Sequence, residues 1–310
     1  MKYIELRLRR DFGGVITAYL DFLKVNIKSM FNAFVNYNAV LFILVFIASF
    51  FLSSGFSSVM RMQTAMLSGG PTGEIIDSVV MYMIGAFILL LVYMAMFVIN
   101  SGLSGGFIKT YEMNKTHNPD RREAVAILKK RAGGLTLIAI IAAVLFMLVA
   151  AISLLIVIIP ILGILIYMFI ILMYITWIGM SMFAYTYNEN YSIGKALGEG
   201  WDIMFSNFWK AAGVSFVIGL ILYVVFTALQ WIPNVINFYN TFNSIEAAGG
   251  INDSMAMQIF FFIFTSISTV LSIFSFFLYQ TALGVLYIDL HEHKYNRYLR
   301  TRIESIGQRS

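Results

Sequence analysis

Cysteine is absent from this 310-residue chain, which excludes disulfide bonds, thiolate metal sites and a cysteine nucleophile. Histidine occurs only at His117, His291 and His293, so few side chains suit metal binding or acid–base catalysis. Charge is scarce too, because Asp, Glu, Lys and Arg make up 12 % of the residues, against about 25 % in soluble domains. These shortages place the chain among integral membrane proteins.

The chain is rich in apolar residues, which make up 60 % of the sequence, and its mean hydropathy is +0.82. The stretch from Ala132 to Asn188 contains no Asp, Glu, Lys, Arg or His. About 20 apolar residues cross the bilayer core, so this stretch is long enough to cross twice. Pro160 and Gly163 near its middle supply a turn. We therefore predict two transmembrane helices, at 135–158 and 161–185.

Four further apolar segments complete the prediction of an all-α integral membrane protein, a single polytopic domain over 1–310. They predict transmembrane helices at 38–55, 75–100, 211–232 and 257–289. Small and polar residues predict far-side loops at 56–74 and 233–256, and a basic tail occupies 290–310. The first twelve residues lack the long apolar core of a cleaved signal peptide.

Two other stretches, 11–33 and 192–210, carry apolar side chains at the three- and four-residue spacing of a one-sided helix. We expect these amphipathic helices to lie in the membrane interface or across the cytoplasmic ends of other helices. Asp11 and Ser192 can cap their first turns.

The two amphipathic stretches align with a constant offset of 181 residues, which matches Leu20 with Trp201 and Asn26 with Asn207. This favours a repeated unit of amphipathic helix plus hairpin, used three times. In the middle unit the amphipathic part, around 119–131, is short and basic. Similar composition without a true repeat is the alternative explanation.

The distribution of charge predicts the topology. Of the 21 Lys and Arg residues, only Arg61 falls in a segment assigned to the far side. This positive-inside bias predicts a multi-pass protein of the bacterial inner membrane with both termini in the cytoplasm. The isoelectric point near 9.2 then indicates contact with anionic lipid headgroups, and no nucleic-acid partner is needed.

A run of small residues ends the second predicted span, and it predicts close helix packing. The candidates are Ser101, Gly102, Gly105 and Gly106. A glycine-rich phosphate loop is not favoured, because no strand precedes the run and no Lys-Ser/Thr closes it. On the second amphipathic stretch, the candidate interaction residues are Trp201, Phe205 and Phe208.

The predicted spans contain almost no ionisable residues, which disfavours an ion-coupled transporter. His291 and His293 form the one sequence cluster that resembles a metal motif. A spacing of two residues places them about 200° apart on a helix, so they would not converge on one ion. We therefore interpret the segment as a polar surface tail, with Asp289 and Glu292 in weak surface pairs with nearby arginines. No catalytic residue, metal or cofactor is predicted.

The stretch IGKALGEGW at 193–201, followed by NFWK at 207–210, resembles a superfamily of six-helix bacterial membrane proteins. Its best-named members form the membrane domain that precedes the catalytic domain of some glycerophosphodiester phosphodiesterases. The segment AYLDFLKVN at 18–26 looks similar. The resemblance implies a membrane module without an assigned activity, and no phosphodiesterase domain is present to supply catalytic residues.

The hypothesis that follows is a non-enzymatic inner-membrane protein that acts as a subunit or scaffold of a membrane protein complex. Its expected partners are the lipid bilayer and other membrane proteins. The alternative is a lipid or small-molecule transporter or flippase. That alternative predicts a wet cavity at mid-membrane depth, lined by Ser, Thr, Tyr and Asn side chains.

Overall fold

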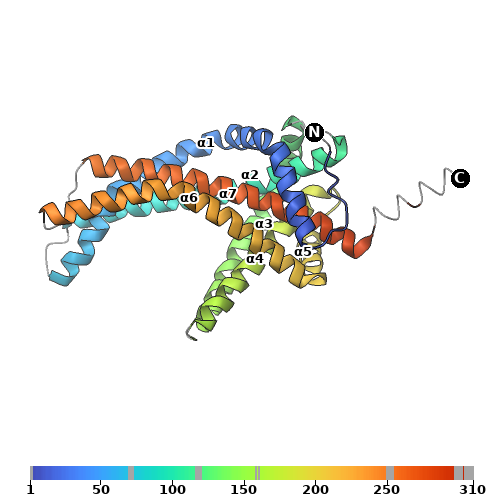
Figure 1. Ribbon diagram of the computed structural model, residues 1–310. Coiled ribbons are helices and arrows are strands. Elements are labelled where there is room, and N and C mark those ends of the chain that lie inside the picture. Colours follow the sequence, from blue (N-terminus) through green and yellow to red (C-terminus); the bar gives the residue numbers. More distant parts are fainter. Residues whose placement is uncertain are drawn as a thin grey trace. The chain divides into compact units, whose positions relative to one another are not determined.

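The computed structural model describes residues 3–68, 73–115, 121–157, 159, 161–248, 255–296 and 303. In this part of the chain there are seven helices and no strand (Figure 1). The helices are α1 (Phe12–Ser68), α2 (Gly73–Asn114), α3 (Arg121–Ile156), α4 (Leu162–Tyr187), α5 (Ile193–Ser206), α6 (Phe208–Ala248) and α7 (Met255–Tyr295). All except α5 are long and apolar enough to cross a membrane. The predicted all-α membrane fold with six spanning helices is confirmed.

The helices contribute to two compact units. Unit 1 comprises Met1–Asn36, Phe97–Ile221 and Phe276–Ser310, so it holds α3, α4, α5 and one part of each of the other helices. Unit 2 comprises Tyr37–Met96 and Leu222–Ser275, the remaining parts of α1, α2, α6 and α7.

Close backbone contact and aromatic rings hold unit 2 together. A Cβ added at Gly85 of α2 would lie 2.9 Å from the carbonyl oxygen of Ala48 and the amide nitrogen of Leu52, both on α1. Only glycine allows this approach of the two helices. Between α6 and α7, the rings of Phe226 and Phe274 meet edge to face with centroids 6.0 Å apart.

In unit 1, α3 and α4 lie side by side as a hairpin (Figure 1). The turn falls where the proline and glycine predict it, since α3 ends at Ile156 and α4 begins at Leu162. Ile161 adopts a left-handed φ of 62°, and a Cβ at Gly163 would lie 2.0 Å from the carbonyl oxygen of Ile156. The chain reverses tightly because glycine leaves room for that carbonyl. Pro160 lies outside the described residues.

The two predicted far-side loops are corrected by the structure. In place of a loop at 56–74, α1 continues to Ser68 and α2 begins at Gly73. In place of a loop at 233–256, α6 continues through Pro233 to Ala248 and α7 begins at Met255. Isolated small or polar residues lower helix stability by less than about 1 kcal/mol each, and a long apolar helix absorbs that cost. Pro233 removes one backbone hydrogen bond without ending so long a helix.

Several predicted segments also merge or shift. The stretches 11–33 and 38–55 are parts of one helix, α1, and 119–131 and 135–158 meet in α3. In contrast, 192–210 is divided, because α5 ends at Ser206 and α6 begins at Phe208. The predicted boundaries were placed where the polarity of the sequence changes. A helix continues through such a change unless its backbone is forced to turn.

Candidate functional site: a polar cavity at the ends of α2 and α4

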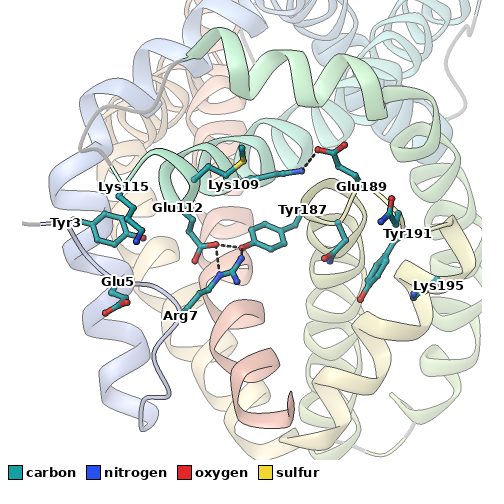
Figure 2. Close-up of a pocket in the computed structure, with 13 residues that line it drawn as sticks. Tyr3, Glu5, Arg7, Lys109, Glu112, Lys115, Tyr187, Glu189, Tyr191 and Lys195 are labelled. Carbon is teal, nitrogen blue, oxygen red and sulfur yellow. Dashed lines mark hydrogen bonds and ion pairs between the residues drawn. The ribbon is translucent and has the colours of Figure 1, made fainter. Parts of the chain in front are cut away.

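A polar cavity of about 690 Å³ lies in unit 1, where three separate stretches of chain meet. They are the segment before α1, the end of α2, and the α4–α5 connection together with the first turn of α5. The lining residues are Tyr3, Glu5, Arg7, Lys109, Glu112, Met113, Lys115, Tyr187, Asn188, Glu189, Asn190, Tyr191 and Lys195 (Figure 2).

Arg7, Glu112 and Tyr187 converge on one wall of the cavity (Figure 2). Arg7 Nε donates to Glu112 Oε2 at 3.2 Å, and the Arg7 guanidinium also donates to the Tyr187 hydroxyl. The Tyr187 hydroxyl donates in turn to the same carboxylate oxygen. The Glu112 side chain is only 6 % exposed, whereas that of Arg7 is 49 % exposed. A buried carboxylate needs charged or hydrogen-bonding partners, so Glu112 holds the Arg7 side chain in place. Arg7 thereby joins the segment before α1 to the ends of α2 and α4.

Tyr3 closes another side of the cavity. Its ring stacks on that of Tyr111 with centroids 5.1 Å apart, and the Ile4 N–H donates to the Tyr111 hydroxyl at 2.8 Å. Burial, followed by the negative charge of Glu112, raises the pKa of Tyr3 to about 12. Tyr3 therefore keeps its phenolic proton at neutral pH and can act as a hydrogen-bond donor.

Glu189 links two helices at the opposite side of the cavity. Its carboxylate oxygens accept from Lys109 Nζ on α2 and from Lys130 Nζ on α3, each at 3.0 Å. Hydrogen bonds from Lys109 and then Lys130 lower the pKa of Glu189 to about 2, so the carboxylate is ionised at any physiological pH.

Arg131 of α3 stabilises the α4–α5 connection. Its guanidinium donates to the carbonyl oxygens of Tyr185, Asn188 and Tyr191 and lies 4.0 Å from the centre of the Tyr185 ring. One side chain thus satisfies several backbone carbonyls of a short connection, which gives this wall a defined shape.

A second polar cluster joins the N-terminal segment to α6 and α7. Asp289 is 1 % exposed and accepts from the Arg10 N–H at 2.9 Å and from Lys210 Nζ at 2.5 Å. Arg9 Nε donates to His293 Nδ1 at 2.8 Å. The other ring nitrogen, Nε2, lies 3.0 Å from the Arg10 carbonyl oxygen and 2.9 Å from Lys210 Nζ, so His293 joins the N-terminal segment to both α6 and α7.

This cluster corrects two expectations about the end of the chain. The predicted tail at 290–310 begins as helix, because α7 continues to Tyr295. Asp289 and Glu292 are not surface residues, since both are buried. The reason is tertiary, because the segment before α1 lies against this turn of α7 and removes it from solvent. His291 lies apart from His293, with its Nε2 3.9 Å from Glu199 on α5, and no metal-type cluster of His, Cys, Asp or Glu occurs among the described residues.

Of the four predicted packing residues of α2, which are Ser101, Gly102, Gly105 and Gly106, the three glycines lie at contacts with the α3–α4 hairpin. Ser101 is buried. A Cβ at Gly102 would lie 2.3 Å from Leu128 on α3, and one at Gly106 would lie 2.5 Å from the carbonyl oxygen of Ala124. A Cβ at Gly105 would lie 2.8 Å from Thr186 on α4. None of the four residues lines the polar cavity.

The predicted interaction residues form a row of rings on α5 and the start of α6. Trp201 and Phe205 have centroids 4.2 Å apart, and Phe205 stacks on Phe208 at 5.5 Å. Phe208 then meets Trp209 edge to face at 5.3 Å. The opposite face of α5 packs on α4, with a Cβ at Gly200 only 2.3 Å from Ser181 Oγ.

No protein-family model, curated protein or solved structure matches the chain. The function of the cavity is therefore inferred from its geometry alone. Sequence reasoning used Arg7, Lys109 and Lys115 only for topology and did not predict Glu112 or Tyr187 as site residues. The available signal was the aromatic and polar stretch at 185–191, which is unusually rich in hydrogen-bonding groups for a helix exit.

Proposed function

We propose that this multi-pass membrane protein is a non-enzymatic subunit or scaffold of a membrane protein complex. The observation that carries the proposal is the row of rings on α5 and α6. Three of its four rings are exposed, although Trp201 and Phe208 also meet rings of α4, those of Trp177 and Phe169. Trp201, Phe205 and Trp209 are 47 %, 44 % and 81 % exposed. Aromatic residues, Trp above all, are enriched at the centres of protein interfaces.

The packing of α5 makes this row a preformed surface. Ser192 caps the helix by accepting from the Lys195 N–H at 3.3 Å, and Trp177 Nε1 donates to the Leu197 carbonyl at 3.0 Å. The buried face consists of Ala196, Gly200, Ile203 and Met204. A surface that is already ordered loses little conformational entropy when a partner binds.

We further propose that the protein resides in a bacterial inner membrane with both termini in the cytoplasm, which is what the positive-inside bias supports. In that orientation the exposed rings, together with the basic residues around them, lie near the cytoplasmic membrane surface. Anionic lipid headgroups are then further expected partners. The resemblance to the membrane domain of glycerophosphodiester phosphodiesterases stays a prediction and is compatible with a module that serves other proteins.

The test is purification of the tagged protein from native membranes in mild detergent, with partners identified by mass spectrometry. We expect a stoichiometric set of membrane proteins with the wild type. The W201A/W209A variant should lose that set. The matched control is Trp231→Ala, because Trp231 is 64 % exposed but lies outside the row. That control should retain the partners.

Two results would contradict the proposal. Recovery of the wild type without any stoichiometric partner would remove the basis for a subunit role. Equal loss of partners from the W201A/W209A and Trp231→Ala variants would show that exposed tryptophans act through the membrane and not as a docking surface. A lone protein that retains a tightly bound lipid would favour the lipid transporter alternative.

A further inference from the structure

The polar cavity has the size and the chemistry of a ligand site, and we propose that it binds the phosphate group of an anionic ligand. Its volume of about 690 Å³ falls within the ~300–1,000 Å³ typical of small-molecule sites. Among the described residues that line it, Met113 is the only aliphatic one. So polar a wall suits a charged group rather than a hydrophobic molecule. This inference does not depend on the scaffold role.

The charges of the wall favour an anion. Four basic side chains, from Arg7, Lys109, Lys115 and Lys195, face three carboxylates. Both oxygens of one of these carboxylates, that of Glu189, already bind lysines, and one of the two is Lys130 from outside the lining. The positive charge therefore exceeds the negative charge at the cavity, and a bound phosphate would balance it.

The beginning of α5 adds to this positive field. Tyr191 and Lys195 line the cavity on either side of the Ser192 cap, so the first turn of α5 lies at its edge. No acidic residue occupies that turn. The partial positive charge of a helix N-terminus favours phosphate, and no carboxylate within this turn neutralises it. Lys195 Nζ rests 4.5 Å from the centre of the Tyr191 ring, which holds the ammonium group near the cavity.

Arg7 is positioned to bind phosphate directly. Glu112 and Tyr187 each take one of the five donor hydrogens of its guanidinium, which fixes the plane of the group. Its side chain is still 49 % exposed and lines the cavity. A guanidinium whose geometry is fixed in advance binds phosphate with less loss of side-chain entropy than a free one.

The same chemistry could come from a soluble phosphate or from a phospholipid headgroup, and the experiment separates the two. Purified, delipidated full-length protein in detergent is titrated with inorganic phosphate, with dioctanoyl phosphatidic acid and with dioctanoylglycerol, which lacks phosphate. We expect saturable binding of phosphatidic acid, or of both phosphate-containing probes, and none of dioctanoylglycerol. Binding of phosphatidic acid alone would assign the site to a lipid headgroup, and binding of inorganic phosphate as well would show that the phosphate group suffices.

The variant K115Q/K195Q removes two cavity cations, and its matched control K24Q/K28Q removes two exposed lysines of α1 that do not line the cavity. We expect K115Q/K195Q to weaken binding about tenfold or more, because each charge-assisted contact contributes substantially. The control should change affinity by less than about twofold, because distant surface charges are screened.

A footprint on the wild type keeps the test decisive if K115Q/K195Q fails to fold. Bound phosphatidic acid or phosphate should protect Lys115 and Lys195 from acetylation and leave Lys24 and Lys28 unprotected. The proposal would be overturned if neither phosphatidic acid nor inorganic phosphate bound saturably. It would also be overturned if K115Q/K195Q and K24Q/K28Q weakened binding equally, or if the ligand protected all four lysines equally from acetylation. None of these results bears on partner recovery through the aromatic row.

Discussion

The first turns of α1 and of α5, 181 residues apart in the chain, begin alike and then diverge. Each starts behind a polar cap, since Asp11 Oδ1 accepts from the Gly14 N–H at 2.7 Å and Ser192 Oγ accepts from the Lys195 N–H at 3.3 Å. From there α1 continues without interruption to Ser68. In contrast, α5 ends at Ser206, and Asn207, with φ −138° and ψ 54°, separates it from α6.

The two segments also differ at one matched position in how closely they pack on a neighbouring helix. Tyr19 of α1 aligns with Gly200 of α5. Tyr19 is buried and donates its hydroxyl hydrogen to the Leu278 carbonyl at 2.9 Å, so a full side chain separates α1 from α7. Gly200 instead lets α5 lie directly on Ser181 of α4. Two segments that follow the same apolar pattern therefore pack on their neighbouring helices at different separations.

The largest effect on this comparison is expected from Lys210→Met. Lys210 of the second segment binds buried Asp289 and the Arg10 carbonyl, which directly precedes the first segment. Removal of one partner leaves a buried carboxylate partly uncompensated, which should lower the free energy of unfolding by about 3 kcal/mol. Thermal and denaturant unfolding in detergent would measure the loss.

The control for this variant is Ser29→Ala at the matched position of α1. The Ser29 hydroxyl is buried and has no hydrogen-bond partner among the described residues, so its removal should be neutral or slightly stabilising. The K210M/D289N double variant should recover part of the loss. Equal destabilisation by Lys210→Met and Ser29→Ala would refute the role of the buried pair.

A smaller effect is expected from Gly200→Ala, because its Cβ would lie 2.9 Å from the Ser181 amide nitrogen. Overpacking against a backbone should lower the free energy of unfolding by about 1–3 kcal/mol. Gly198 lies on the same helix with nothing within 4 Å of a Cβ, so Gly198→Ala should stabilise the protein by up to about 1 kcal/mol. Unfolding curves that move in the same direction for both variants would disprove the close α4–α5 contact.

Tyr19→Phe tests the other side of the comparison. The variant keeps the ring and removes the hydrogen bond to the Leu278 carbonyl. We expect a loss of about 1 kcal/mol in unfolding free energy, because that carbonyl loses its side-chain partner. Tyr223→Phe serves as the control, since Tyr223 is 67 % exposed and its side chain is not buried against a neighbouring helix. A loss no larger than that of the control would mean that the Tyr19 hydrogen bond contributes nothing.

The smallest effects should come from the caps, and they should be similar in the two segments. Asp11→Ala and Ser192→Ala should each cost about 0.5–1 kcal/mol, whereas the exchanges Asp11→Ser and Ser192→Asp should be nearly neutral. Hydrogen exchange of the amides in the first turn is the most sensitive measurement. If hydrogen exchange became faster in only one of the two alanine variants, the caps of α1 and α5 would differ in their contribution to stability.

Sequence reasoning succeeded where the physical cause is local or compositional. The charge-free stretch from Ala132 to Asn188 and the turn near Gly163 follow from hydrophobic length and glycine geometry. It failed where small residues were taken as loops, because a helix through 56–68 or 233–248 depends on the whole segment and not on its weakest residues. The cavity was missed because its lining comes from three stretches far apart in the chain.

By itself, the sequence determined that this is an all-α membrane protein with six spanning helices and that Asp11 and Ser192 cap theirs. These properties depend on the hydrophobicity of continuous segments and on hydrogen bonds across three residues. Only the tertiary structure decided that Asp289 is buried, that α5 separates from α6, and that Arg7 meets Glu112 and Tyr187. The burial of Asp289 by Arg10 and the contacts of Arg7 join residues more than 100 positions apart, and no local pattern encodes such contacts.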